Sequence, residues 1–202
     1  MNLPNSLTIT RLFLVPLLVV VLLTKFEGRQ ILGVPKEIVG AVIFAIASLT
    51  DWADGYFARR RKQVTPFGQM IDPLADKLLT SAALISLVQM ELAQSWMVAV
   101  IIGREFAVTT LRSLAYARGV AVPASSLGKI KMVAQVVAIL ALILAHGGRR
   151  EFYLIGQAAL WVVVIAALVS GADYFRRFNA VLSPRMHDGR TRGDRLTDGR
   201  AE

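Results

Sequence analysis

Residues 38–76 read IVGAVIFAIASLTDWADGYFARRRKQVTPFGQMIDPLAD. The stretch begins with an apolar run, which is followed by two acids, by the basic residues 59–62 and by two further acids at its end. Asp51 falls 14 residues into the run that begins at Ile38. An ionised side chain at such depth in a membrane helix costs at least about 2.5–3.5 kcal/mol, so acids placed there usually have partners and a function. This stretch therefore predicts a membrane helix that carries acids to a functional site.

Apolar blocks of similar length recur on both sides of this stretch. We predict six transmembrane helices, at residues 7–24, 38–58, 74–92, 96–116, 130–145 and 152–174. The chain is 55% hydrophobic and 18% charged, with a mean hydropathy of +0.55, which is more apolar than a soluble domain of 202 residues. The expected fold is an all-α integral membrane protein, with one six-helix catalytic domain over residues 1–182. Residues 183–202, rich in Gly, Arg and Asp, are expected to form a disordered cytoplasmic tail.

The net charge of +9 is distributed unevenly between the predicted loops. Basic residues gather at 59–62, at Arg118 and Lys129, and at 176–177, whereas the alternate loops are nearly balanced. The positive-inside rule then places both termini and the active site on the cytoplasmic side of the inner membrane. The basic excess is explained by topology and requires no nucleic-acid partner.

Four aspartates occupy two helical faces near this cytoplasmic side. Asp51 and Asp54 share one face with Gly55 and Ala58, within an arc of about 100°, and Asp72 and Asp76 lie one turn apart on the next helix. Four converging carboxylates require cations, and hard oxygen ligands without Cys favour two Mg²⁺ or Mn²⁺ ions. The alternative is that the acids are helix caps paired with the basic loop. Asp72-Pro73 does have the pattern of a helix start, but capping would explain Asp72 alone.

The spacing D-x2-D-G-x2-A-R-x8-G-x3-D-x3-D over residues 51–76 resembles the signature of the CDP-alcohol phosphotransferase family at every fixed position. The resemblance implies a six-helix membrane fold, usually a homodimer, in which the four aspartates share two metals that bridge the CDP diphosphate. It also implies that Asp76 is the general base. Residues 4–8, PNSLT, resemble the family's amino-terminal element. The CDP-binding residues implied by the two motifs are Asn5, Thr8, Asp54, Gly55, Ala58 and Arg59.

A second polar cluster is expected to select the alcohol. Arg104, Arg112 and Arg118 span an arc of about 120° on one predicted helix, and guanidinium groups suit phosphate geometry, so we predict an acceptor that carries a phosphate. Lys129 could complete this phosphate cradle. Lys131 lies about 200° further round the helix, so it ranks lower. The alternative is that the arginines reach the membrane interface with Glu105 as counter-ion, which fits Arg118 better than Arg104.

The pieces R-E-x6-R and S-x2-G-K-x-K within residues 104–131 resemble the branch of this family that forms phosphatidylglycerophosphate. Met132 departs from the Thr expected after the second Lys. The implied reaction transfers a phosphatidyl group from CDP-diacylglycerol to sn-glycerol 3-phosphate and releases CMP. The same chemistry on an inositol phosphate or another alcohol is the alternative. A membrane prenyltransferase would place its acids in separate halves of a longer chain, and a cation transporter would leave the arginines without a role.

Overall fold

The computed structural model describes residues 3–24, 30–31, 33–61, 66–117 and 126–182. Within these helices, the side chains of residues 3–9, 51–61, 66–76, 114–117, 126–127, 129, 174–175 and 177–182 lie outside the described part.

The described chain consists of six helices and one short hairpin. The helices are α1 (Leu3–Leu23), α2 (Lys36–Arg61), α3 (Pro66–Gln89), α4 (Ser95–Ala117), α5 (Ser126–Ala145) and α6 (Arg150–Leu182). Between α1 and α2, β1 (Gln30–Ile31) pairs antiparallel with β2 (Val34–Pro35). The predicted all-helical class is confirmed, and each of the six predicted apolar segments overlaps one helix.

The start of α3 corrects one prediction. The helix begins at Pro66, so Asp72-Pro73 is not a helix start and both residues lie within α3. Thr65-Pro66 carries the same start signal, a residue that favours N-caps followed by Pro at the first helical position. Where two such signals compete, the earlier one starts the helix here, and residues 66–73 lengthen α3 beyond the predicted apolar run.

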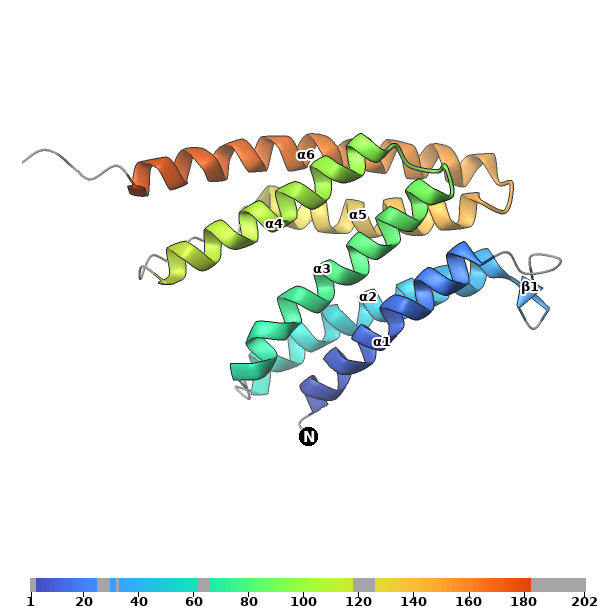
Figure 1. Cartoon of the computed structure of the whole chain (residues 1–202), viewed down its shortest axis with the longest axis horizontal. Coiled ribbons are helices and arrows are strands. Elements are labelled where there is room, and N and C mark those ends of the chain that lie inside the picture. Colours follow the sequence, from blue (N-terminus) through green and yellow to red (C-terminus); the bar gives the residue numbers. More distant parts are fainter. Residues whose placement is uncertain (1–2, 25–29, 32, 62–65, 118–125, 183–202) are drawn as a thin grey trace, which may run out of the picture.

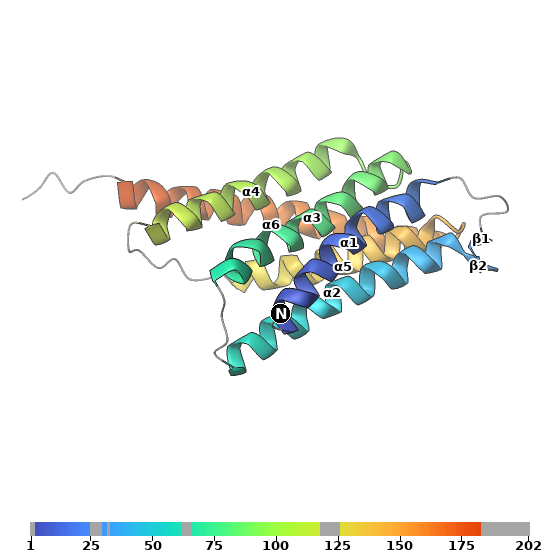
Figure 2. The ribbon, with the colours of Figure 1, turned by 60° about the horizontal axis from the view of Figure 1, so that its bottom comes forward.

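Consecutive helices run in opposite directions and form one elongated bundle (Figure 1). The helix α6 packs on α5 and α4, while α1 packs on α2 and α3, and α2 also contacts α5. Figure 2 shows α1 and α2 along one side of the bundle. The beginning of α1, the end of α2 and the beginning of α3 therefore lie toward the same end of the molecule as the end of α4 and the beginning of α5.

The core and the outer surface of the bundle are both apolar. Side chains from every helix fill the core, among them Leu18, Phe44, Leu84, Ile101, Leu142 and Leu160, each fully buried. Large apolar side chains also face outward on all the helices, and Val20, Ile46 and Val133 are each more than half exposed. Helices that are apolar on every face suit a lipid environment, because lipid, unlike water, does not favour a polar outer face.

Two glycines let neighbouring helices approach closely. A Cβ atom at Gly40 would lie 2.6 Å from Leu22 Cδ2 on α1, and one at Gly156 would lie 2.6 Å from Leu142 Cγ on α5. Real Cβ atoms do not come this near. A side chain at Gly40 would have to displace the end of Leu22, and one at Gly156 would also crowd the backbone nitrogen of Leu142, at 3.1 Å. Close approach at small residues is a usual way for membrane helices to pack.

One described helix is long and apolar enough to cross a membrane by length and composition, at Arg150–Asp173. Shorter apolar stretches occur at Thr10–Leu23, Lys77–Gln89 and Ile130–Ala145. These spans refer only to the described residues, which omit parts of several helices. Six transmembrane helices therefore remain a prediction.

Candidate active site

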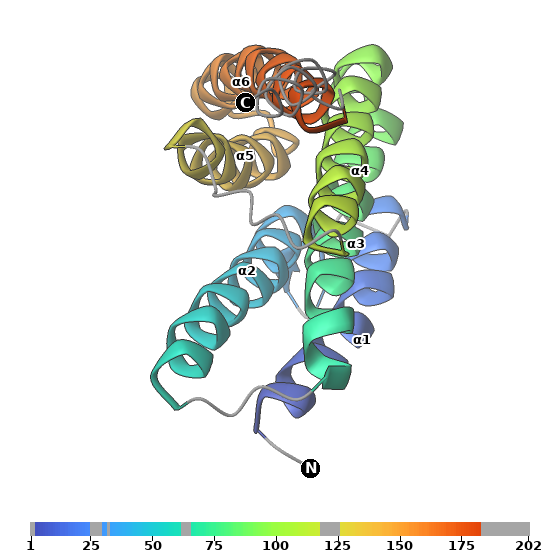
Figure 3. The same ribbon diagram turned by 90° about the vertical axis from the view of Figure 1, so that its left-hand side faces the viewer.

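The four signature aspartates lie on two helices that contact each other. Asp51 and Asp54 belong to the second half of α2, and Asp72 and Asp76 to the first half of α3. These two helix portions lie toward the same end of the bundle (Figure 3). The backbone thus places the two acidic segments toward one end of the bundle. The aspartate side chains lie outside the described part, so their convergence stays a prediction.

The metal assignment rests on the chemistry of these donors. Among the side chains that the structure describes, no group of three or more His, Cys, Asp or Glu could hold a metal ion. The four aspartates are not in that set. Their donor atoms, all carboxylate oxygens on two contacting helices, fit hard divalent cations such as Mg²⁺ or Mn²⁺.

The residues predicted to hold the nucleotide lie on α1 and α2. Asn5 and Thr8 are in the first turns of α1, and Gly55, Ala58 and Arg59 are near the end of α2; α1 contacts both α2 and α3. Their side chains also lie outside the described part. Arg11, which follows Thr8 by one helical turn, is described and is only 1% exposed. A buried guanidinium needs anionic or hydrogen-bonding partners.

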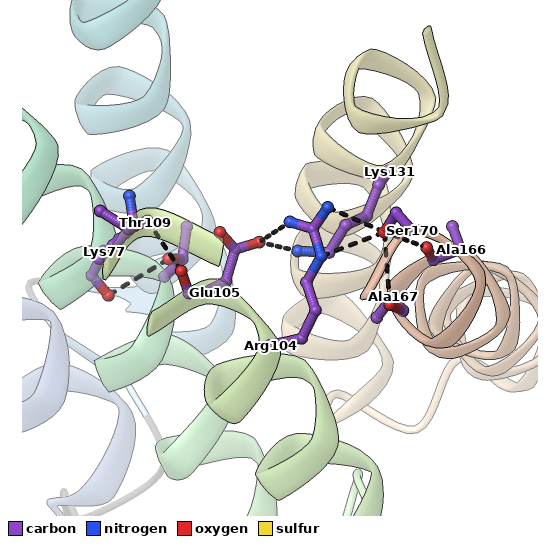
Figure 4. Close-up of polar contacts among 9 residues, drawn as sticks. Lys77, Arg104, Glu105, Thr109, Lys131, Ala166, Ala167 and Ser170 are labelled. Atoms are coloured by element: carbon purple, nitrogen blue, oxygen red, sulfur yellow. Dashed lines mark hydrogen bonds and ion pairs between the residues drawn. The ribbon is translucent and has the colours of Figure 1, made fainter. Parts of the chain in front are cut away.

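Arg104 is the best-defined residue of the predicted phosphate cradle. It lies near the middle of α4, and its guanidinium reaches α6, where Nε and Nη2 both donate hydrogen bonds to Ser170 Oγ, at 3.1 and 2.8 Å. Figure 4 shows the guanidinium between Ser170 on one side and Glu105 on the other. The separation from Arg104 Nη1 to Glu105 Oε1 is 3.7 Å, an ion pair rather than a hydrogen bond. The side chain of Arg104 is thus held between two helices.

Glu105 also joins α4 to α5. Its Oε1 atom forms an ion pair with Lys131 Nζ, and the Lys131 side chain is only 2% exposed (Figure 4). Glu105 is therefore the counter-ion of both Arg104 and Lys131. Among the contacts that the structure describes, this one carboxylate thus lies between two cations.

The other cradle residues are less completely placed. Arg112 is exposed on α4, two turns beyond Arg104. Lys129 is in the first turn of α5, but its side chain lies outside the described part, and Arg118 lies wholly outside it. The structure therefore brings Arg104 to Glu105 and Lys131, and does not show whether Arg112, Arg118 and Lys129 join them.

Sequence reasoning missed one residue of this cluster and underrated another. Lys131 ranked below Lys129 because the two lie on different faces of α5, yet the amino group of Lys131 reaches Glu105. Ser170 was not considered, because the last apolar segment has no motif around it. The only available signal was the Ser-Gly pair at 170–171, two small residues near the end of the predicted segment 152–174.

Comparison with known proteins agrees with the signature. The family model described as CDP-alcohol phosphatidyltransferase matches residues 1–169. A CDP-diacylglycerol–glycerol-3-phosphate 3-phosphatidyltransferase of Bacillus subtilis (strain 168) is 49% identical over 183 residues, which cover 87% of this chain and 94% of the relative. Proteins of the same name from Rickettsia bellii (strain RML369-C) and Pseudomonas fluorescens are 37% and 35% identical over 87% of this chain, covering 94% and 89% of the relatives. This chain belongs to the CDP-alcohol phosphatidyltransferase family, as the spacing of its aspartates predicts.

Proposed function

We propose that this chain transfers a phosphatidyl group from CDP-diacylglycerol to sn-glycerol 3-phosphate, giving phosphatidylglycerophosphate and CMP. The observation that carries the proposal is its similarity, along nearly the whole length of both chains, to relatives named for this reaction. The cluster of Arg104, Glu105 and Lys131 supports it independently, because an acceptor with a phosphate needs fixed cations near the reacting hydroxyl.

The donor would bind at the end of the bundle that carries the signature. Asp51, Asp54, Asp72 and Asp76 would hold two divalent cations, which neutralise charge on the diphosphate and on the departing CMP. Cytidine and phosphate contacts would come from α1 and α2, through Asn5, Thr8, Asp54, Gly55, Ala58 and Arg59.

The reaction is a displacement at phosphorus. The acceptor hydroxyl oxygen forms a bond to the lipid-bearing phosphorus, and the bond from that phosphorus to CMP breaks, so CMP leaves with the electron pair. Asp76 accepts the hydroxyl proton as general base. Arg104, Arg112, Arg118 and Lys129 hold the acceptor's phosphate and keep its hydroxyl in line, which lowers the entropic part of the barrier.

The protein would act as a multi-pass homodimer in the inner membrane. The outward apolar side chains of all six helices support six crossings, with lipids around the bundle. The distribution of Lys and Arg supports cytoplasmic termini and a cytoplasmic active site. Residues 1–182 would form the catalytic domain, and residues 183–202 a disordered cytoplasmic tail.

The proposed reaction predicts CMP release that depends on the acceptor. Purified protein would be incubated with CDP-diacylglycerol, Mn²⁺ and, in separate samples, glycerol 3-phosphate, glycerol, inositol or inositol 1-phosphate. Release is expected with glycerol 3-phosphate and not with the alcohols that lack a phosphate, because the cradle then has no anion to bind. Release with inositol phosphate alone would move the assignment to that acceptor, and no release with any alcohol would contradict the transferase.

The proposed orientation predicts cytoplasmic labelling at Gln63, which lies between α2 and α3 next to the basic residues. The chain has no cysteine, so Gln63→Cys creates a single thiol without background. In sealed vesicles of known orientation, a membrane-impermeant maleimide should react from the cytoplasmic side only. Reaction from the opposite side alone would reverse the topology.

A further inference from the structure

We infer that Ser170 is a positioning residue for the acceptor site, because it fixes the Arg104 guanidinium before the acceptor binds. The inference rests on the proposed function, in which Arg104 holds the acceptor's phosphate. Ser170 lies one residue beyond the part of the chain that the family model matches.

The hydrogen-bonding capacity of the Ser170 hydroxyl is fully used. A serine hydroxyl has one donor and two acceptor positions. Its O–H donates to the carbonyl oxygen of Ala166, one turn earlier in α6, and its oxygen accepts from both Nε and Nη2 of Arg104. Because the donor is directed to its own helix, the oxygen lone pairs are directed toward α4 (Figure 4). The hydroxyl is therefore aligned to receive a guanidinium.

Two donors on one oxygen fix the plane of the guanidinium as well as its position. Nε and Nη2 form one edge of the group, and that edge faces Ser170, so the bonds to Ser170 set the direction in which the end of the group, with Nη1 and Nη2, points. Planar recognition of phosphate depends on this orientation. Ordering a long side chain before the ligand arrives also removes an entropic cost from binding.

The surroundings of Ser170 hold the arrangement in place. Ser170 is 2% exposed and the side chain of Arg104 is 12% exposed, so little water competes for these bonds. The next residue, Gly171, has no side chain, and a Cβ atom there would lie 3.6 Å from Arg104 Cγ. That is an ordinary van der Waals distance, so the arginine stem lies directly against α6 at this position.

The chain provides a matched control for this serine. Ser86 on α3 is 1% exposed, and its hydroxyl also donates to the carbonyl one turn earlier, that of Ala82, at 2.8 Å. Both serines therefore make the same bond within an apolar helix, but only Ser170 accepts bonds from Arg104. Removing each hydroxyl separates the contact with Arg104 from the general effect of a buried serine.

The test is steady-state kinetics of the full chain with both substrates varied. Ser170→Ala should raise the Michaelis constant for glycerol 3-phosphate about three- to ten-fold, the usual effect of one lost hydrogen-bonding partner. The constant for CDP-diacylglycerol should not change. Ser170→Thr, which retains the hydroxyl, should restore the wild-type acceptor constant, and Ser86→Ala should leave it unchanged. In an Arg104→Ala background, Ser170→Ala should have no further effect on the acceptor constant.

The inference and the proposed function fail in different ways. If wild-type protein releases no CMP with glycerol 3-phosphate, the function fails. If wild-type protein is active and Ser170→Ala keeps the wild-type acceptor constant, or changes it no more than Ser86→Ala does, Ser170 has no positioning role. Should Ser170→Ala not fold, Ser170→Cys keeps the shape and replaces the oxygen by a weak acceptor, so the same rise is expected from it.

Discussion

Asp51→Asn, Asp54→Asn and Asp72→Asn are each expected to abolish turnover, mainly through loss of metal. Each change removes one negative charge and one strong oxygen ligand from a site that would hold two divalent cations. If the metals contribute about 4 kcal/mol to transition-state stabilisation, turnover should fall about a thousand-fold or more. The measurements are CMP release and equilibrium binding of Mn²⁺ by each purified variant.

The controls separate metal loss from other effects. Glu91→Gln removes a carboxylate from an exposed position in the turn after α3, outside the signature, and should bind Mn²⁺ as the wild type does. Asp76→Asn should lose turnover but keep its affinity for the acceptor if Asp76 takes the hydroxyl proton. Unchanged Mn²⁺ affinity in all three variants of the first set would remove the two-metal assignment.

Arg104→Ala, Arg112→Ala and Lys129→Ala are each expected to weaken use of glycerol 3-phosphate much more than use of CDP-diacylglycerol. A charge-assisted contact contributes about 1.5–3 kcal/mol, which corresponds to roughly ten- to a hundred-fold in the acceptor constant. Arg112→Lys should recover little, because an ammonium group does not reproduce the planar guanidinium. The measurement is a two-substrate kinetic matrix for each variant, with CMP release as the readout.

Arg150→Ala is the control for loss of a positive charge. Arg150 is exposed in the first turn of α6, whereas Ser170 lies 20 residues further along that helix, so the acceptor constant should not change. Arg104→Ala and Arg112→Ala could instead lose affinity for CDP-diacylglycerol and keep the wild-type acceptor constant. In that case the cluster binds the donor, CDP-diacylglycerol, and only the names of the relatives would support glycerol 3-phosphate as the acceptor.

The sequence determines the family and the helical class of this protein, because both depend on features within one or two helices. The spacing of the acids from Asp51 to Asp76 identifies the family without any tertiary information, and the lengths of the apolar runs predict the six helices. The start of α3 was mispredicted within this same stretch. Two start signals compete there, Thr65-Pro66 and Asp72-Pro73. Hydrophobicity alone gives no reason to prefer the earlier signal, at which the helix begins.

Only the tertiary structure decided which side chains accompany Arg104. Its bonds to Ser170 join residues 66 positions apart, and no local pattern relates the two. The pairing of Lys131 with Glu105 depends on which face of α5 is turned toward α4. Helical periodicity gives the angle between two residues on one helix, but the rotation of that helix within the bundle is set by packing with its neighbours.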